Sequence, residues 1–310
     1  HNSGRRQRQM CIRDSSESQI AFNFLKFANT FKKTDPLICF AAKSNSNLSI
    51  LRILGKLGAG ADVVSGGELL KALKAGIRPN KIVFSGVGKT EEELKIAINK
   101  KILLINCESE SEAKLVNNLS KKLRKKVSIG FRLNPNVDAK THKNISTGKA
   151  ENKFGLSIKN FKVFLKTVKT FKNVKFEALS VHIGSQILND TPFRKTLNVM
   201  SKLIKELKLN LKYVDLGGGF GINYTDKEKP INLSKYSKLV HNFSKKLNCK
   251  IIFEPGRSII GNTGLLISKI QFIKKGANKN FIILDAGMND FMRPASVSYT
   301  HLTLPTTGIV

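Results

Sequence analysis

Lys43 is the residue best placed for covalent chemistry. It follows an apolar, strand-like run from Leu37 to Ala42, and a helix is expected to begin near Leu48. In a barrel of alternating strands and helices, the C-terminal ends of the strands form the active-site face, and the loops that follow carry the reacting groups. A lysine amine at this position indicates imine chemistry with a carbonyl compound.

Two glycine-rich segments suit the binding of an anion. Residues 215–221 read Asp-Leu-Gly-Gly-Gly-Phe-Gly and residues 254–257 read Glu-Pro-Gly-Arg, each directly after an apolar run. Such loops let backbone N–H groups close around a phosphate, and TIM barrels often bind a phosphate after their seventh and eighth strands. One glycine cluster alone is typical of a tight turn, but two at adjacent strand ends, facing Lys43, favour a phosphate site.

His182 and Glu254 complete the chemical set. A lone histidine at a strand end, as in Val181-His182, is usually a structural residue. Because His182 shares a rim with Lys43, the glycine loops and Glu254, we expect its ring to stack on a planar ligand. An amine for an imine, glycines for a phosphate, a stacking imidazole and a carboxylate for a pyridinium nitrogen together describe pyridoxal phosphate.

The elements that must position these residues alternate along the chain. Eight apolar runs read as strands, at 38–42, 61–64, 82–84, 102–106, 127–133, 176–181, 213–216 and 251–253. Segments of helical period lie between them, at 48–57, 68–75, 91–99, 112–123, 158–170, 193–207 and 233–247. This alternation predicts an α/β fold with parallel strands, best satisfied by a closed (β/α)8 TIM barrel, with an open doubly wound sheet as the alternative.

Seven short strings resemble the fold-type III pyridoxal-phosphate decarboxylases, and within them the diaminopimelate decarboxylases. They occur in family order, at residues 40–45, 60–68, 132–135, 182–186, 217–221, 254–258 and 285–290. The resemblance implies an alanine racemase-like barrel that binds pyridoxal phosphate. It also implies decarboxylation of meso-2,6-diaminopimelate to L-lysine and carbon dioxide, the last step of lysine biosynthesis.

The resemblance assigns roles to matching positions. Lys43 would hold the cofactor through its amine, His182 would stack on the cofactor ring and Glu254 would pair with the pyridine nitrogen, which makes these three the catalytic residues. Arg257 and Arg293 would hold the distal carboxylate of the substrate. The remaining cofactor contacts would come from Asp62, Ser185, Gly218, Gly219, Pro255 and Gly256, with Arg257 also in the phosphate loop.

The resemblance also sets the expected domain organisation. Residues 16–35 are a helical lead-in, 36–258 the barrel, and 259–295 the beginning of a second, β-rich domain, without the family's Cys-Glu-Ser-Gly-Asp motif and its proton-donating cysteine. Residues 1–15 hold four of eleven arginines and no lysine, and 296–310 hold no charged residue, so both ends are interpreted as non-native sequence. We therefore expect the chain to be an incomplete, catalytically impaired piece of its parent enzyme, with exposed apolar strands that favour aggregation.

Composition adds expectations about partners. The net charge of +32 suggests nucleic-acid binding, but the lysines are scattered and no recognition motif accompanies them, so a solvated surface is preferred. Gly88-Lys89-Thr90 ends like a phosphate-binding P-loop, yet Val83 stands where its first glycine should be. Four cysteines without paired spacing indicate a reducing compartment and no metal site, and no segment could cross a membrane. A cytoplasmic location follows, and the family implies a homodimer for the full-length protein.

Two related functions remain open. One is a decarboxylase of the same fold that acts on ornithine or arginine, and the other is a barrel that carries pyridoxal phosphate without catalysis. Gln186 and the string at 285–290 favour diaminopimelate, and the continuation past residue 259 argues against a simple carrier. In each case the bound partner is a small molecule, an amino-acid substrate or the cofactor.

Overall fold

The computed structural model describes residues 11–139, 148, 153–224, 228, 229 and 231–291. The chain divides into two compact units, which are described separately. The larger unit runs from Glu17 to Asn262, and the smaller combines residues 1–16 with residues 263–310.

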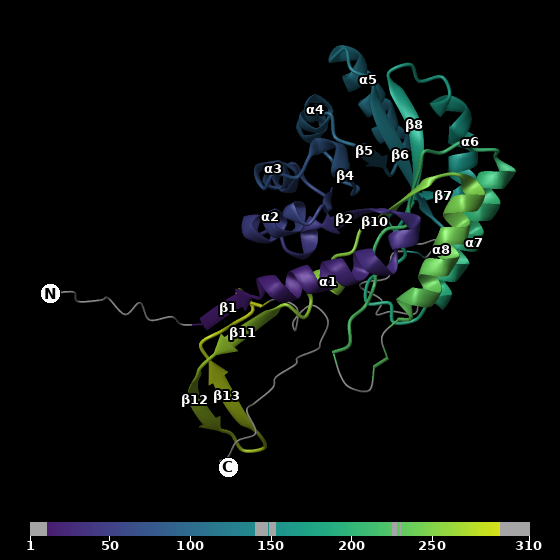
Figure 1. Ribbon diagram of the computed structural model, residues 1–310. Helices are drawn as coiled ribbons and strands as arrows, with labels where there is room; N and C mark the ends of the chain where they lie inside the picture. The colour runs from purple at the N-terminus through teal and green to yellow at the C-terminus, as the bar shows by residue number, and fades with distance from the viewer. Residues whose placement is uncertain (1–10, 140–147, 149–152, 225–227, 230, 292–310) are drawn as a thin grey trace. The chain divides into compact units, whose positions relative to one another are not determined.

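Eight parallel strands close the larger unit into a barrel (Figure 1). Each strand pairs with the next along the chain, and the last pairs with the first, through Ile252 beside Leu37. The strands are β2 (Leu37–Ala41), β3 (Gly60–Val63), β4 (Ile82–Phe84), β5 (Leu104–Cys107), β6 (Val127–Asn134), β8 (Val174–Val181), β9 (Tyr213–Asp215) and β10 (Lys250–Phe253). The predicted TIM barrel is confirmed, and the open sheet is excluded because β2 and β10 pair.

The strands are continuous apolar runs because both of their faces are covered. Side chains alternate between the two faces of a strand. In β2, Phe40 packs in the large core between strands and helices, while Cys39 belongs to a separate cluster with Val83 and Ile252. That second cluster fills the inside of the barrel. A polar residue flanked by two outward-facing apolar neighbours therefore points into the barrel.

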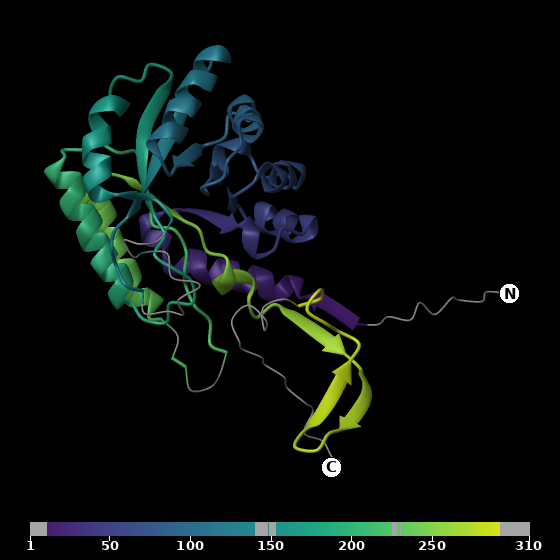
Figure 2. The same ribbon diagram turned by 180° about the vertical axis from the view of Figure 1, so that it is seen from behind.

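Helices form the outer layer, as Figure 2 shows from behind. Every segment predicted to be helical is a helix, with ends that differ by a few residues. The crossover helices are α2 (Leu48–Lys56), α3 (Gly66–Lys74), α4 (Glu91–Lys100), α5 (Glu110–Lys122), α6 (Ile158–Val168), α7 (Thr191–Glu206) and α8 (Leu233–Leu247). A two-residue strand, β7 (Leu156–Ser157), pairs with β6, and single 3-10 turns lie at η1 (Lys32–Thr34), η2 (Ala42–Ser44) and η3 (Pro79–Lys81).

Side-chain caps determine where several helices begin. The hydroxyl groups of Ser65, Thr90 and Ser109 each accept a hydrogen bond from the backbone N–H three residues later. Each of those later residues is a glutamate, so the three helices share the Ser/Thr-x-x-Glu spacing of a capping box. Since these helices follow β3, β4 and β5, the caps fix the loops at the C-terminal ends of three neighbouring strands.

Aromatic packing anchors the loops on the other side of the barrel. Helix α1 (Glu17–Thr30) places Phe27 against Phe253 at the end of β10, with ring centroids 5.6 Å apart. The ring of Phe27 also meets Phe220, which follows the glycine-rich loop, at 5.1 Å. The short helix α9 (Arg257–Ile260) packs beside α1. The barrel unit therefore extends to Asn262, beyond the predicted boundary at residue 258.

The smaller unit contains two antiparallel pairs of strands. Strand β1 (Cys11–Ser15) pairs with β11 (Gly264–Ser268), and β12 (Ile270–Lys275) pairs with β13 (Asn280–Leu284). Lys269 alone separates β11 from β12. The last five residues of the segment interpreted as non-native, 1–15, form β1. Large apolar side chains, including Leu265 and Phe272, are exposed on this unit.

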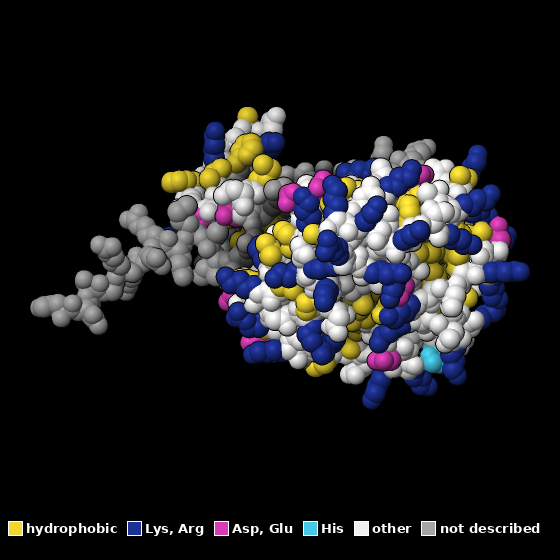
Figure 3. Space-filling model, turned by 90° about the horizontal axis from the view of Figure 1, so that it is seen from above, with side chains coloured by type: hydrophobic (Ala, Val, Ile, Leu, Met, Phe, Trp, Pro, Cys, Tyr) yellow, Lys and Arg dark blue, Asp and Glu magenta, His cyan; other side chains and the backbone are white. Residues whose placement is uncertain are grey.

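Basic side chains are spread over the surface. In Figure 3 lysine and arginine side chains lie across the whole visible face of the barrel, with a few acidic side chains between them. No helix in the described part of the chain has the length and apolar character needed to span a membrane.

Candidate active site at the C-terminal end of the barrel

Lys43 and Asp62 form an ion pair at the mouth of the barrel. Lys43 lies in η2, directly after β2, and its Nζ donates a 2.9 Å hydrogen bond to Oδ2 of Asp62 on β3. The lysine side chain is 44% exposed, whereas the Asp62 side chain is fully buried. Burial lowers the pKa of Lys43, but the carboxylates of Asp62 and Glu254 outweigh it, and the pKa is raised. The structure therefore presents a protonated amine at the open end of the barrel.

Asp62 keeps an unused acceptor beside that amine. Its Oδ1 atom is buried and has no hydrogen-bond partner within the described residues. A buried polar atom without a partner usually costs free energy. Such an atom next to a reactive amine marks a place where a ligand or water donates a hydrogen bond.

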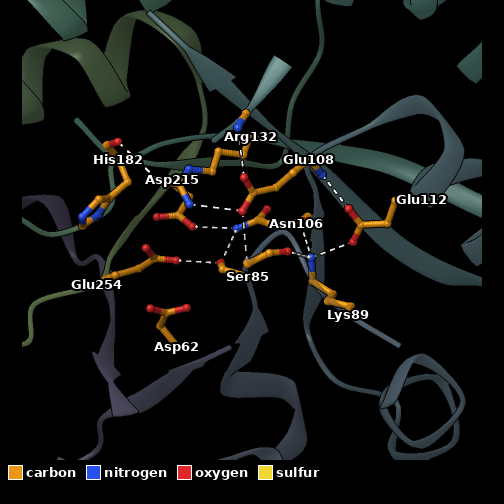
Figure 4. Close-up of polar contacts among 12 residues, drawn as sticks. Asp62, Ser85, Lys89, Asn106, Glu108, Glu112, Arg132, His182, Asp215 and Glu254 are labelled. Carbon is orange, nitrogen blue, oxygen red and sulfur yellow. Dashed lines mark hydrogen bonds and ion pairs between the residues drawn. The ribbon is translucent and has the colours of Figure 1, made fainter. Parts of the chain in front are cut away.

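Four buried polar side chains form a network inside the barrel (Figure 4). Ser85, directly after β4, donates from its hydroxyl to Oε1 of Glu254 at 3.2 Å. Asn106 on β5 donates from Nδ2 to Ser85 Oγ at 3.3 Å and to Asp215 Oδ2 at 3.0 Å. Ser85 and Asn106 thus link Glu254 to Asp215 through their side chains.

The two acids of this network are hard to ionise together. Burial, followed by the charge of Asp62, raises the pKa of Asp215 to about 6, although its hydrogen bonds act in the opposite direction. Burial and the charges of Asp215 and Asp62 raise the pKa of Glu254 well above its ordinary value. A cationic or hydrogen-bond-donating ligand placed beside these acids would be favoured by their charge.

His182 is neutral and has a defined tautomer. It follows β8, and its Nδ1 accepts a 3.2 Å hydrogen bond from the backbone N–H of Gly218. Burial, together with the positive charges of Lys43 and Arg132, lowers the pKa of His182 well below its ordinary value. Because Nδ1 is an acceptor, the ring proton lies on Nε2.

The glycine loops pack too closely for side chains. A Cβ atom on Gly218 would lie 2.1 Å from the carbonyl oxygen of Glu254, and one on Gly219 would lie 2.4 Å from that of Gly184. Gly219 also has a φ of 93°, which favours glycine. The N–H groups of Gly219 and Gly256 make no hydrogen bond in the part of the chain that the structure describes. These two donors are available for an anion.

Arg257 lies beside the free N–H groups of Gly219 and Gly256, which we call the glycine cradle. Its Nε and one terminal nitrogen each donate to Ser185 Oγ at 3.3 Å, and its other terminal nitrogen donates to the Tyr224 hydroxyl at 2.6 Å. The guanidinium also faces the Tyr224 ring, 5.9 Å from its centroid. Tyr224 and Ser185 thus hold a planar, bidentate cation near the cradle, which suits a carboxylate or a phosphate.

Buried ion pairs connect the loops that surround the acid network. Glu108, directly after β5, accepts from Arg132 at 3.1 Å and from the N–H of Gly86 at 3.1 Å. Lys89 has a fully buried side chain whose Nζ donates to Glu112 at 2.6 Å and to the carbonyl oxygens of Gly86 and Asn106 at 2.7 and 2.8 Å. Lys89 therefore binds two loops together and has no role in a phosphate-binding loop.

The structure brings the predicted site residues to one end of the barrel. Lys43, Asp62, His182, Ser185, Gly218, Gly219, Glu254, Pro255, Gly256 and Arg257 lie at or after the C-terminal ends of β2, β3, β8, β9 and β10. Direct contacts join Lys43 to Asp62, His182 to Gly218, and Ser185 to Arg257. The carbonyl oxygen of Pro255 accepts from the N–H of Ala41, which ties this loop to β2. Arg293 lies outside the described residues.

The sequence analysis assigned no role to several polar residues of this site. Ser85, Asn106, Arg132 and Asp215 all point into the barrel, and each follows an apolar residue that belongs to the outer core. The pattern apolar–polar–apolar near a strand end, as in Ile105-Asn106-Cys107, is the signal that identifies them.

The residues present fit pyridoxal phosphate. Lys43 offers an amine for the aldehyde, Gly219 and Gly256 offer unpaired N–H donors for the phosphate, and Glu254 offers a carboxyl group for the ring nitrogen. Oδ1 of Asp62 has no partner among the described residues, so it can accept a hydrogen bond from a ligand. The acids Asp62, Asp215 and Glu254 outnumber the nearby cation Lys43, which favours a ligand with a protonated ring.

Comparisons with known proteins agree with this chemistry. Residues 17–261 match the family model described as "Pyridoxal-dependent decarboxylase, pyridoxal binding domain". The diaminopimelate decarboxylase of Aquifex aeolicus is 44% identical over 274 residues, 87% of this chain and 65% of the relative. The corresponding protein of Helicobacter pylori strain J99 is 45% identical over 283 residues, 90% of this chain and 69% of the relative. This chain therefore spans about two thirds of the length of these curated relatives.

Solved structures show the same likeness. The crystal structure of the Helicobacter pylori diaminopimelate decarboxylase complexed with L-lysine has a TM-score of 0.89 and 42% identity, over 94% of this chain and 74% of that one. A diaminopimelate decarboxylase from M. jannaschii, also in complex with L-lysine, has a TM-score of 0.85 and 36% identity, over 94% of this chain and 70% of that one.

Proposed function

Because this chain belongs to the pyridoxal-dependent decarboxylases and contains their pyridoxal-binding domain, we propose that the protein decarboxylates meso-2,6-diaminopimelate to L-lysine and carbon dioxide. The observation that carries the proposal is the pairing of Lys43 with Asp62 at the mouth of a closed barrel, beside the acid network. The substrate is taken from the relatives, whose names specify diaminopimelate, and from the Helicobacter pylori and M. jannaschii structures, which were solved with L-lysine.

Lys43 is the proposed attachment point of the cofactor. When bound, pyridoxal phosphate supplies an electron sink that accepts the electron pair left behind as carbon dioxide departs. The Lys43 amine must lose its proton before it can attack an aldehyde, and Asp62 is the nearest base, 2.9 Å away. Asp62 thus holds the amine in place and takes part in its deprotonation.

His182, Gly219, Gly256 and Glu254 are proposed to hold the cofactor. The neutral imidazole of His182 offers a flat, uncharged face, and the Gly218 N–H fixes the ring orientation. The free N–H groups of Gly219 and Gly256 would bind the phosphate. Glu254 would face the ring nitrogen and stabilise positive charge on it.

Arg257 and Arg293 are proposed to bind the distal carboxylate of the substrate. The hydrogen bonds of Arg257 to Ser185 and Tyr224 hold its guanidinium plane, which favours bidentate recognition. Since Arg257 also borders the glycine cradle, it could serve the phosphate as well. The role of Arg293 rests on the motif alone.

Two neighbouring functions are distinguished by the substrate. A decarboxylase for ornithine or arginine would need no partner for a second carboxylate, and a carrier would release no carbon dioxide. Gln186, which favours diaminopimelate by its place in the motif, donates to the carbonyl oxygen of Ile222 at 2.6 Å and accepts from its N–H at 3.2 Å. Its structural role is to hold the loop that leads to Tyr224.

We also propose a homodimer in the cytoplasm. The dimer is proposed from the family, in which each active site uses residues of both subunits. The reducing location is proposed because Cys39, Cys107 and Cys249 are buried, free thiols. Light scattering at several protein concentrations tests the dimer.

A product assay tests the proposed function. The purified full-length parent enzyme is incubated with pyridoxal phosphate and diaminopimelate, ornithine or arginine, and carbon dioxide and the amine product are measured. We expect carbon dioxide and lysine from diaminopimelate only, and no product from the Lys43→Ala variant. The exposed Lys95→Ala variant is the matched control. Turnover of ornithine or arginine in preference would favour the alternative decarboxylase, and cofactor binding without any product would favour the carrier.

A further inference from the structure

A polar pocket lies on the outer wall of the barrel, between η1 and α8. Helix α8 packs against both η1 and α1, which belong to the outer layer (Figure 1). The pocket has a volume of about 320 Å³, which is at the lower end of the range of roughly 300–1,000 Å³ found for small-molecule sites. It is therefore large enough to hold a small ligand.

The pocket is separate from the candidate active site. The turn η1 precedes β2, the first strand of the barrel, and therefore lies near the N-terminal end of that strand. The candidate active-site residues lie at or after the C-terminal ends of the strands. A ligand in this pocket would not compete with the cofactor for a binding site.

Helix α8 supplies one wall of the pocket. Ser237 and His241 are four residues apart, so they lie on the same side of the helix. Lys238 and Asn242 have the same spacing, one residue further along. The first pair is half-buried and the second pair is exposed. Ser237 and His241 thus form the floor of this wall, and the other two form its rim.

The hydroxyl groups of the pocket show which kind of ligand it suits. Thr30 Oγ1 donates to a carbonyl oxygen of α1 at 2.8 Å, and Ser237 Oγ donates to a carbonyl oxygen of α8 at 2.9 Å. Thr34 Oγ1, on η1, is buried and has no partner among the described residues. Because a hydroxyl group has a single hydrogen, only that of Thr34 remains available to a ligand.

The charged side chains at the pocket are positive and unpaired. Lys33 on η1 and Lys238 on α8 line it, and neither side chain forms an ion pair or hydrogen bond with another described residue. By contrast, Lys235 on the same helix lies 3.8 Å from a carboxylate oxygen of Asp190. No acidic side chain is among the described residues that line the pocket. The free donors and the charge therefore both favour an anion.

The donors suit a phosphate group better than a carboxylate. The described lining contains no arginine, whose planar fork matches a carboxylate. Two separate ammonium groups, a hydroxyl group and an imidazole come from two different walls, and a phosphate has oxygens that can accept from several directions. The lining also includes Phe31, an apolar surface that suits a small organic group attached to the phosphate.

We propose that this pocket binds a phosphate group, either as inorganic phosphate or at the end of a small phosphomonoester. Lys33 and Lys238 balance its negative charge, and the Thr34 hydroxyl donates to one of its oxygens. The proposal is independent of the proposed function, because none of these residues belongs to the candidate active site.

The NMR signal of the His241 ring tests the proposal locally. This ring lines the pocket, and its signal is assigned by its loss in His241→Gln. Inorganic phosphate is added to the purified protein at constant pH and constant ionic strength. We expect the His241 signal to shift and to saturate. Because the signal reports on this pocket, phosphate bound in the glycine cradle does not produce the result.

Variants separate a shaped site from diffuse attraction to a basic surface. Lys33→Met/Lys238→Met removes both charges, so phosphate should bind at least about tenfold more weakly. Thr34→Val keeps the shape of the side chain but removes the free hydroxyl, so the affinity should fall about two- to tenfold. Lys235→Met is the matched control, since it removes a charge from α8 outside the pocket, and its affinity should stay at the wild-type value.

Further probes identify the ligand and can overturn the proposal. Glycerol 3-phosphate that binds more tightly than inorganic phosphate indicates a phosphomonoester, and equal affinities indicate free phosphate. A His241 signal that moves with neither probe overturns the proposal, as does a loss of affinity in Lys235→Met equal to that in Lys33→Met/Lys238→Met. Succinate that binds more tightly than both phosphates overturns the assignment of phosphate.

Discussion

Replacement of Lys89 by methionine should destabilise the barrel severely. The Lys89 side chain is fully buried, and its Nζ donates to Glu112 and to the carbonyl oxygens of Gly86 and Asn106. Methionine has a similar length but no hydrogen to donate. The substitution therefore leaves a carboxylate and two backbone oxygens without their donor.

The expected cost follows from that loss. Removal of one partner from a buried ion pair costs about 3–5 kcal/mol, because the remaining charge is uncompensated. Domains of this kind are stable by about 5–15 kcal/mol, so the variant loses a large part of the total. With a urea dependence of about 1–3 kcal/mol per molar, the midpoint of unfolding should fall by about 1 M or more.

Urea unfolding followed by circular dichroism measures the effect. Lys95→Met is the matched control, since Lys95 pairs with Glu91 and Glu92 on the exposed face of α4, and its midpoint should stay close to wild type. The double variant Lys89→Met/Glu112→Gln should lose less than the sum of its single variants, because neither charge remains. A Lys89→Met midpoint as high as that of Lys95→Met would refute the reasoning.

Three further predictions concern the site. Gly218→Ala places a Cβ 2.1 Å from the Glu254 carbonyl oxygen, so overpacking of about 1–3 kcal/mol should weaken the binding of pyridoxal phosphate in a titration. Gly88→Ala is the control, because Gly88 has open space around it, and its affinity for pyridoxal phosphate should be unchanged. The pKa of Glu254 is raised in the folded protein, so the contribution of this carboxyl group to stability is full below its ordinary pKa of 4.5 and falls as the pH rises. The free energy of unfolding of Glu254→Gln, relative to that of the wild-type protein, should therefore rise from about pH 5 to about pH 8. A difference between the two proteins that does not change with pH would contradict this. The lowered pKa of His182 predicts a ring NMR signal that does not move between about pH 6 and pH 8, and a midpoint in that range would show that burial does not keep it neutral.

Much of the barrel is predictable because its signal is local. Apolar runs such as Ile82–Phe84 alternate with helices that begin at Ser or Thr caps, and both features are visible in short windows of sequence. The position of Lys43 after the first such run identifies the reactive end of the barrel. The closure of the barrel cannot be predicted from short windows of sequence, because the pairing of Ile252 with Leu37 joins segments more than two hundred residues apart.

The acid network was missed for a physical reason. Ser85, Asn106 and Asp215 lie within or beside apolar strands, where a single polar residue reads as an interruption of the pattern. Their meaning depends on which strands become neighbours and which faces point inward, and neither is encoded by periodicity alone. Lys89 is a similar case, since it lies in a loop, its partner Glu112 lies on α5, and its burial depends on the packing of two loops.

The interpretation of residues 1–15 as non-native sequence stays a prediction. Residues 1–15 were set apart because they are rich in arginine and lack lysine, yet Cys11–Ser15 pair with Gly264–Ser268. Backbone hydrogen bonds place few demands on side-chain type, so an unusual composition does not prevent a segment from pairing as a strand.

Borohydride reduction in the presence of pyridoxal phosphate tests the central claim most directly. Reduction traps the cofactor on the amine that holds it, and peptide mass mapping identifies that lysine. The account predicts one dominant phosphopyridoxyl adduct on Lys43, lost in Lys43→Ala and retained in Lys95→Ala. Adducts spread over many surface lysines, or a pattern unchanged in Lys43→Ala, would contradict the assignment of the barrel mouth as the cofactor site.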